Sequence, residues 1–155
     1  ILLFPAVYRR PRIMASILKV DTLTGVTTAG SISVTGEGNS TTTNLQQGLA
    51  KAWATMNATG TAALRDSFNV SGLTDNGTGD FSFAYSSNFS AINDYTAGGM
   101  VANTSNANTS YLFQPRSSTL LITSSARMSM KYNTASAEGM ADYAYGATTM
   151  HGDLA

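Results

Sequence analysis

Apolar and polar side chains alternate with a period of two along two neighbouring stretches of the chain. The apolar positions of these stretches are Phe68, Val70, Phe81, Phe83 and Tyr85, and small or polar residues separate them. In a strand this period places one set of side chains on a buried face and the other on a solvent face. Residues 75–80 (DNGTGD) tolerate positive φ or bond their own backbone, as turn residues do. The pattern predicts a β-hairpin over residues 65–88.

Shorter strands are expected along the rest of the chain. The apolar runs and the turn residues between them predict strands at 17–21, 32–34, 50–56, 99–102, 111–113 and 140–145, with Pro115 closing the fifth. From residue 120 to 132 the even positions are largely apolar, which is long for one strand, so we expect a bend at Ser124–Ser125. Tyr143 and Tyr145 would share one face of the last strand.

A brief helix is predicted at residues 45–49, capped by Thr43 or Asn44, before the strand at 50–56. That strand would place Trp53 on the face opposite Ala52 and Ala54. The alternative is one continuous helix with Leu45, Leu49, Trp53 and Met56 on a single stripe. In both cases we expect Trp53 to be a core or subunit-contact residue rather than a residue that stacks on a ligand.

Together these elements predict an all-β protein with a β-sandwich or jelly-roll-like head. The head would span residues 45–155. Residues 14–44 are rich in Gly, Ser and Thr and would form an extended stem, although a plain linker has the same composition. Residues 1–13 place three arginines after an apolar run, the reverse of a secretory signal. They are either an extension without its own fold or an arm held by a neighbouring chain.

The composition narrows the choice of partners. Nine basic and nine acidic residues cancel, which removes the main electrostatic argument for a nucleic-acid partner. Only 12% of the residues are charged, and Ser, Thr and Asn make up about a third of the chain, so the surface suits packing of identical chains. The absence of cysteine excludes disulfides and thiolate metal sites. No apolar run approaches the roughly 20 residues of a membrane span, so no membrane insertion is expected.

Four stretches resemble a family of small virion proteins of tailed bacteriophages, the tail-fibre-like or virion structural proteins common among phages of aquatic bacteria. They are residues 14–34 (MASILKVDTLTGVTTAGSISV), 48–53 (GLAKAW), 63–71 (ALRDSFNVS) and 74–81 (TDNGTGDF). The likeness covers most of residues 14–90 and the final strand, is weak between 93 and 118, and does not extend to 1–13. It implies a homotrimeric appendage whose slender N-terminal part docks on the particle while the β-rich head faces outward.

Catalytic and metal-binding groups are sparse. His151 is the only histidine, and the sequence holds no Gly-x-Ser-x-Gly elbow for a serine nucleophile. Residues 75–80 offer oxygens to calcium but lack the order of an EF-hand loop, so a plain turn is favoured. Three copies of His151 on a trimer axis could hold a metal, but the His-x-His pair of iron-binding fibres is absent. We therefore expect no enzyme activity, no metal and no cofactor.

Candidate recognition residues are chosen by their residue type and by their position in the predicted elements. The loops carrying Tyr95, Asn103, Asn106 and Asn108 are the predicted receptor-binding surface, because loops vary without disturbing strands and tyrosine suits sugars. Trp53, Tyr143 and Tyr145 are predicted subunit contacts. Arg9, Arg10 and Arg12 are predicted to anchor the chain to the particle.

The leading functional hypothesis is a virion structural protein, a trimeric fibre or spike that supports host attachment. Its partners would be two identical chains, other virion proteins of the tail, portal vertex or capsid, and a host surface glycan. It would be assembled in the host cytoplasm and lie on the particle surface. Two alternatives remain open, a capsid decoration (cement) protein and a secreted glycan-binding β-sandwich module.

Overall fold

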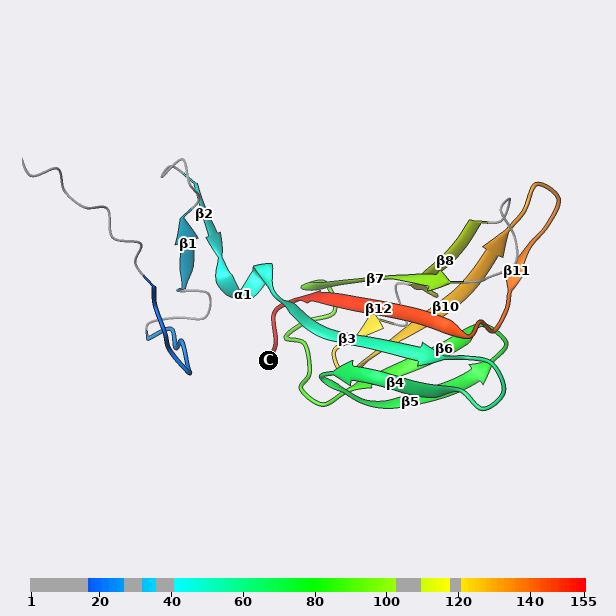
Figure 1. Cartoon of the computed structure of the whole chain (residues 1–155), viewed down its shortest axis with the longest axis horizontal. Coiled ribbons are helices and arrows are strands. Elements are labelled where there is room, and N and C mark those ends of the chain that lie inside the picture. Colours follow the sequence, from blue (N-terminus) through cyan, green and yellow to red (C-terminus); the bar gives the residue numbers. More distant parts are fainter. Residues whose placement is uncertain (1–16, 27–31, 36–40, 103–109, 118–120) are drawn as a thin grey trace, which may run out of the picture.

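The chain is almost entirely β-structured. The structure is a computed structural model, and it describes residues 17–26, 32–35, 41–102, 110–117 and 121–155. Within these residues the only helix is a single turn, α1 (Leu45–Gly48), and Figure 1 shows strands as the main element, joined by loops. The predicted all-β fold class is confirmed.

Two groups of strands follow one another along the chain. The N-terminal group is a small hairpin of β1 (Ser33–Thr35) and β2 (Thr42–Asn44). The second group forms the head and comprises β3 (Ala50–Asn57), β4 (Ala63–Phe68), β5 (Val70–Gly77), β6 (Asp80–Tyr85), β7 (Tyr95–Ala102), β8 (Ser110–Pro115), β9 (Leu121–Ile122), β10 (Ser125–Asn133), β11 (Glu138–Met140) and β12 (Tyr145–Gly152). We call residues 17–26, β1 and β2 the stem, which lies to one side of the head in Figure 1.

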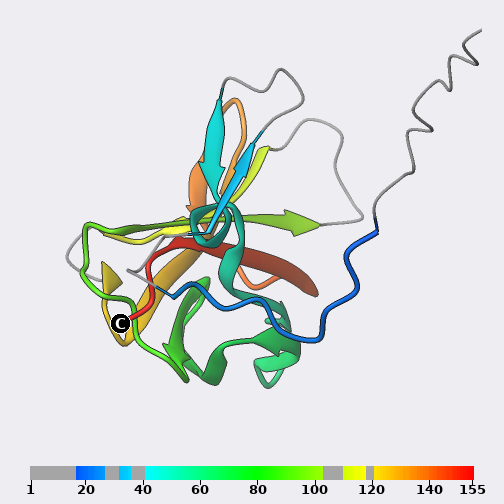
Figure 2. The ribbon, with the colours of Figure 1, turned by 90° about the vertical axis from the view of Figure 1, so that its left-hand side faces the viewer.

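The head is one antiparallel sheet that curls on itself. Its strand order is β4-β3-β12-β7-β8-β10-β6-β5, and β9 and β11 each pair with β10. The edge strands β4 and β5 contact each other, so the sheet is nearly barrel-like. Figure 2, seen from the stem end, shows the strands wrapping around a common interior. Such curling brings an inner face of the sheet together as the core.

The core is filled by phenylalanine, methionine and alanine rather than by branched aliphatic residues. Its buried members include Ala52, Ala126, Met56, Phe81, Phe83, Phe89, Phe113, Met128, Met130 and Met150. Tyr85, Phe89 and Tyr95 form an aromatic cluster, in which the Phe89 and Tyr95 rings stack with centroids 4.2 Å apart. Thioether side chains adapt to irregular gaps, which suits the interior of a curled sheet.

The predicted hairpin is confirmed in its second arm and corrected in its first. Phe81, Phe83 and Tyr85 are buried, and β5 turns into β6 through Thr78–Gly79, within the predicted turn. The first arm is two strands, however, because Asn69 adopts a left-handed φ of 55° between β4 and β5. This corner turns Phe68 outward, where 52% of its surface is exposed.

Some of the other predicted helices and strands are confirmed and some are wrong. The one-turn helix, the strand that follows it and the strand before Pro115 are confirmed, whereas the continuous-helix alternative is wrong. Residues 17–21 form no strand, and the expected bend near residue 124 is a reversal, since β9 pairs antiparallel with β10. Residues 141–144 are not a strand, so Tyr143 and Tyr145 do not share a face. The predicted strand at 99–102 is the end of the longer β7.

Candidate functional site

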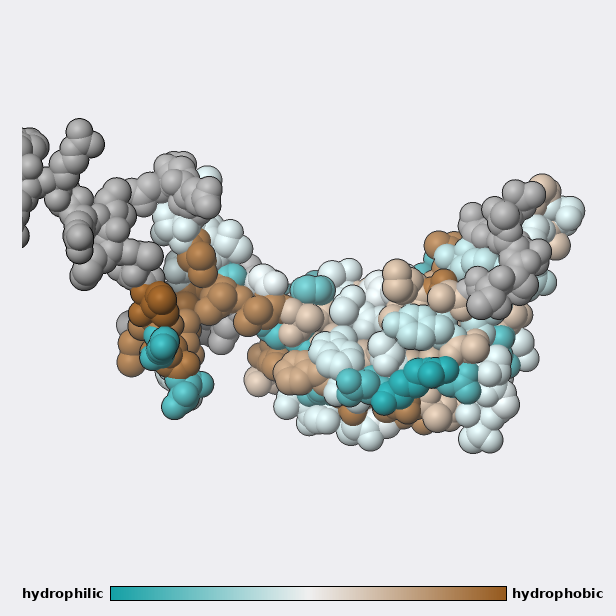
Figure 3. Space-filling model, viewed as in Figure 1, coloured by the Kyte–Doolittle hydropathy of each residue, from teal (hydrophilic) through white to brown (hydrophobic). Residues whose placement is uncertain are grey.

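The stem exposes a series of apolar side chains that the rest of the described chain leaves uncovered. They are Ile17, Leu18, Val20, Leu23, Val26 and Val34, from 51% exposed at Val34 to 95% at Val26. In Figure 3 the stem, beside the head, shows much brown, hydrophobic surface. Contiguous exposed apolar surface of this kind marks an interaction site. The stem is therefore the most hydrophobic exposed part of the described molecule.

A second feature lies on the outer face of the head, over β3, β12 and β7. Two rows of paired residues cross these strands. In the first row Trp53 on β3 pairs with Thr149 on β12, which pairs with Gly98 on β7. In the second row Thr55 pairs with Ala147, which pairs with Met100. Directly paired residues in an antiparallel sheet point to the same side. The rows enclose a groove of about 490 Å³, which we call the Trp53 groove.

The walls and floor of the Trp53 groove differ in character. Phe68 lies beside Trp53 on the neighbouring strand β4, and Met100 on the opposite wall is 61% exposed. A Cβ at Gly98, the partner of Thr149 on β7, would meet no atom within 4 Å, so the surface beside the groove is open there. The only side-chain polar atoms in the two rows are the Trp53 indole N–H and the hydroxyls of Thr55 and Thr149.

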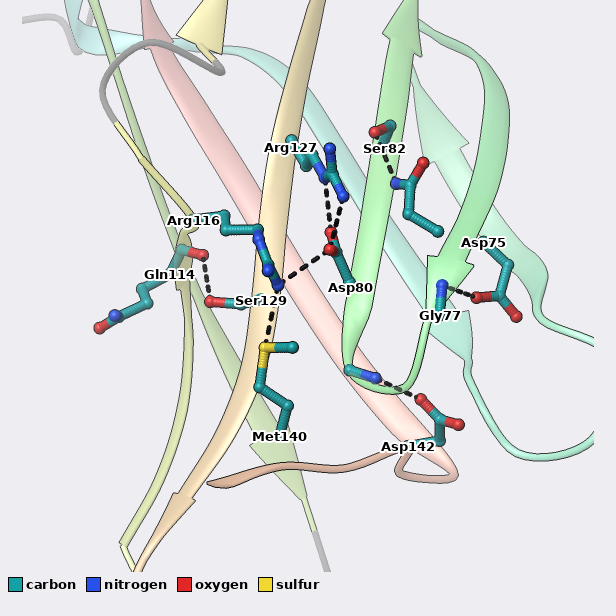
Figure 4. Close-up of polar contacts among 12 residues, drawn as sticks. Asp75, Gly77, Asp80, Ser82, Gln114, Arg116, Arg127, Ser129, Met140 and Asp142 are labelled. Carbon is teal, nitrogen blue, oxygen red and sulfur yellow. Dashed lines mark hydrogen bonds and ion pairs between the residues drawn. The ribbon is translucent and has the colours of Figure 1, made fainter. Parts of the chain in front are cut away.

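A charged cluster occupies another part of the outer face (Figure 4). The Asp80 carboxylate on β6 accepts hydrogen bonds from Arg127 Nε and Nη2 on β10, each at 2.7 Å. Arg116 Nη1 lies 2.8 Å from the same carboxylate and donates to the Met140 sulfur at 3.1 Å. Asp80 is 4% exposed, so its charge is buried but fully paired.

The arginines fix the protonation state of Asp80. The hydrogen bonds from Arg127 lower the pKa of Asp80 below its ordinary value of 3.8, burial opposes them, and the nearby charges of Arg116 and Arg127 lower it further. The same hydrogen bonds raise the pKa of Arg127. A carboxylate held ionised by two partners is a poor general acid or base. The cluster is suited to joining strands rather than to proton transfer.

The tip of the β5–β6 hairpin is fixed by backbone hydrogen bonds. Gly79 N–H donates to Asp142 Oδ1 at 2.6 Å, and its carbonyl accepts from Met130 N–H at 2.8 Å. Asp75 Oδ1 accepts from Gly77 N–H at 2.9 Å. Figure 4 shows that Asp75, Asp80 and Asp142 turn to separate partners, so these carboxylates do not converge on one point.

A smaller cleft of about 280 Å³ lies beside the charged cluster. Arg116, Lys131 and Glu138 line it together with Met140. Its opposite charges favour neither an anion nor a cation. Among the residues that the structure describes, no group of three or more His, Asp or Glu side chains could hold a metal ion. In the same residues no helix is long and apolar enough to cross a membrane.

The prediction that Tyr95 lies on a receptor-facing loop is wrong. Tyr95 begins strand β7, is 8% exposed, and donates its hydroxyl to the carbonyls of Ile122 and Ser125 at 3.0 and 3.3 Å. Burial raises its pKa. Its ring was needed to complete the aromatic cluster with Tyr85 and Phe89, a requirement that local sequence does not show.

The other predicted recognition residues remain predictions. Trp53 is not in the core but half-buried in its groove, Tyr145 is 37% exposed, and Tyr143 packs edge-on against Tyr111 at a ring distance of 5.1 Å. His151 is exposed on β12. The predicted receptor residues Asn103, Asn106 and Asn108 and the predicted anchor residues Arg9, Arg10 and Arg12 lie outside the described residues.

The residues that sequence reasoning missed are those that act across strands. The sequence predicts only a turn around Asp80, and the alternation over residues 120–132 makes Arg127 only one of its polar positions. The sequence held one signal of this ion pair. Asp80 and Arg127 have opposite charges, and they lie at the turn of the predicted hairpin and at a polar position of a predicted strand. The pairing of β6 with β10, which places Asp80 opposite Ser129 and next to Arg127, was not predictable from spacing.

Comparisons with protein-family models, curated proteins and solved structures found no match for this chain.

Proposed function

We propose that this chain is a non-enzymatic structural protein of a bacteriophage virion. In this proposal it forms a homotrimeric fibre or spike, in which the stem joins the chains and links them to the particle. The head then faces outward and supports host attachment. The observation that carries the proposal is the row of uncovered apolar side chains on the stem, from Ile17 to Val34.

The stem is poorly suited to exist alone. Fully burying one Val, Leu or Ile side chain stabilises a protein by about 1.5–3 kcal/mol, and the stem leaves several of these side chains in water. An isolated two-stranded hairpin such as β1–β2 is at best marginally stable. Packing against other chains would bury the apolar side chains and stabilise the hairpin. The number three, and the virion setting, rest on the resemblance of residues 14–90 to phage virion proteins.

The head supports a structural rather than a catalytic role. Its most buried carboxylate, Asp80, is neutralised by two arginines, and its charges are few. A rigid curled sheet with a continuous core is a suitable platform for a surface exposed to the medium.

Location on the particle tests this proposal. Particles of the phage that encodes the chain would be imaged by cryo-electron microscopy, and the density assigned with a tag on the C-terminus. A small multiple of three copies at the tail or at a vertex is expected. Hundreds of copies on the capsid lattice would make the chain a cement protein instead. Purified particles that lack the chain would refute a virion role.

A further inference from the structure

We infer that the Trp53 groove is a binding site for a neutral saccharide of one or two sugar rings. The inference extends the attachment role proposed above and rests on it for its biological meaning. The site itself is argued from the geometry of β3, β12 and β7. It differs from the loop surface around residues 103–108 that the sequence predicted.

The size of the groove favours a small ligand over a protein. Its volume of about 490 Å³ lies within the range of roughly 300–1,000 Å³ that is typical of small-molecule sites. A stable protein interface takes about 20–30 residues a side. The described lining of the groove comprises only eight residues, with Gly99 and two alanines among them. A single sugar ring fits such a depression better than the convex surface of another chain does.

The charge of the groove favours a neutral ligand. None of the described residues that line it has an ionisable side chain. Asp66 on the adjoining strand β4 pairs with Thr55, is exposed, and accepts the N–H of Ser67 at 2.8 Å. Phosphates and nucleotides would find no positive charge in this lining, and the Asp66 carboxylate at its edge would repel them.

The lining offers a partner for both kinds of surface on a sugar ring, its apolar C–H face and its hydroxyl groups. The Trp53 ring gives a flat apolar face for the C–H side of a pyranose, and Met100 closes the opposite wall. Within the described residues the Trp53 indole N–H and the Thr149 hydroxyl have no hydrogen-bond partner. The Thr55 hydroxyl donates only a long bond of 3.4 Å to the Asp66 carbonyl. These three groups are available to bind sugar hydroxyls.

Neighbouring contacts hold the floor of the groove in place. The Thr148 hydroxyl donates to the Gly98 carbonyl at 3.0 Å, which ties β12 to β7 beneath the groove. A Cβ at Gly99 would lie 2.4 Å from the Ala147 carbonyl, so the two strands approach closely there. The site is thus preformed, which lowers the cost of ordering side chains on binding.

The chain carries a built-in reporter for the test, because Trp53 is its only tryptophan. Tryptophan fluorescence of the full chain would be followed while neutral sugars are added to millimolar concentration. The probes are glucose, galactose, mannose, N-acetylglucosamine and their short oligomers. A saturable change with one sugar class is expected. No change with any of these sugars would overturn the inference.

Two variants localise the binding, measured by isothermal titration calorimetry with the sugar that responds. Thr149→Val keeps the side-chain shape and should weaken binding about tenfold through loss of one hydrogen bond. Trp53→Ala should abolish binding. Thr74→Val, an exposed strand threonine on β5, is the matched control and should bind as the parent does. Parent-like affinity in Thr149→Val and Trp53→Ala would contradict the site.

The oligomeric state of the same samples separates this inference from the proposed function. If Trp53→Ala loses sugar binding but keeps the mass of the parent assembly, the groove is a ligand site and the stem remains the assembly element. If Trp53→Ala instead dissociates the assembly, the groove is an interface between copies and the saccharide inference fails. A parent chain that binds sugar as a monomer would uphold the site and refute the trimer.

Discussion

Arg127 binds both carboxylate oxygens of Asp80, through Nε and Nη2 at 2.7 Å each, and so joins strand β10 to strand β6. Arg116, one residue beyond the end of β8, adds a third contact to the same carboxylate. The cluster therefore bridges three strands that are neighbours in the sheet. Bidentate arginine–carboxylate pairs are the stronger ion pairs in proteins because both hydrogen bonds are charge-assisted.

Replacing Asp80 with Asn should destabilise the head. The change leaves two arginines without their buried counterion, although both still reach solvent, so we expect a loss of about 2 kcal/mol in the free energy of unfolding. Asp66→Asn is the matched control, since Asp66 is exposed and should cost less than about 0.5 kcal/mol. Urea unfolding followed by circular dichroism measures both. Equal effects would show that the cluster contributes nothing.

The Asp80 cluster also predicts a dependence of stability on pH. The pKa of Asp80 is lower in the folded chain than its ordinary value of 3.8, so the folded state favours the ionised form. This contribution is fully present above 3.8 and is lost as the pH falls through the lower, folded pKa. Urea midpoints measured at descending pH should fall more steeply for the parent chain than for Asp80→Asn. Parallel curves would contradict the assignment.

Gly79→Ala should be far more destabilising than Gly60→Ala. Both glycines have positive φ, 64° and 71°, so both substitutions incur backbone strain of about 1 kcal/mol. A Cβ at Gly79 would also lie 2.6 Å from the Met130 carbonyl, whereas a Cβ at Gly60 would meet open space. We expect a loss of about 3 kcal/mol or more at Gly79 and about 1 kcal/mol at Gly60. Thermal unfolding would show the difference, and a similar loss at both sites would disprove the close approach.

Asn69 should resist substitution for two separable reasons. It has a φ of 55°, and its side-chain amide donates to the carbonyls of Lys51 and Ser87 at 3.0 Å and accepts from Ser87 N–H at 2.6 Å. Asn69→Gly relieves the backbone but loses the hydrogen bonds, while Asn69→Ala loses both. We expect a cost of about 1–2 kcal/mol for Gly and about 1 kcal/mol more for Ala. Chemical denaturation measures both variants, and equal costs would mean that the backbone is unstrained.

Local pattern was sufficient for the elements with one clear buried face. The alternation at Phe81, Phe83 and Tyr85 identified β6, and the break after Leu45–Gly48 identified the start of β3. The same reasoning failed where a backbone corner or a partner distant in the sequence determines which way a side chain faces. Asn69 turns the chain between β4 and β5 and reverses the facing of Phe68. No count of alternating residues reveals a left-handed residue in advance.

The candidate sites were less accessible to sequence reasoning than the strands. The Trp53 groove requires β3, β12 and β7 to be neighbours, and β12 joins β3 across almost the whole length of the head. The sequence predicts a loop at Tyr95, yet its ring completes the core. Both outcomes depend on long-range strand order, which in a sheet of this size has many alternatives. The exposed apolar side chains of the stem were not predicted either, because the Gly, Ser and Thr content of residues 14–44 indicates only an extended stem or a plain linker.

The mass of the full chain in solution tests the central claim, that the apolar stem is covered by identical chains. Sedimentation velocity at micromolar concentration should give a trimer for the parent chain. Replacing Ile17, Leu18 and Val20 with Ser should shift the population toward monomer, whereas Lys19→Ser with Asp21→Ser, in the same segment, should not. A parent chain that sediments as a monomer, or a trimer unaffected by the three apolar substitutions, would contradict the account.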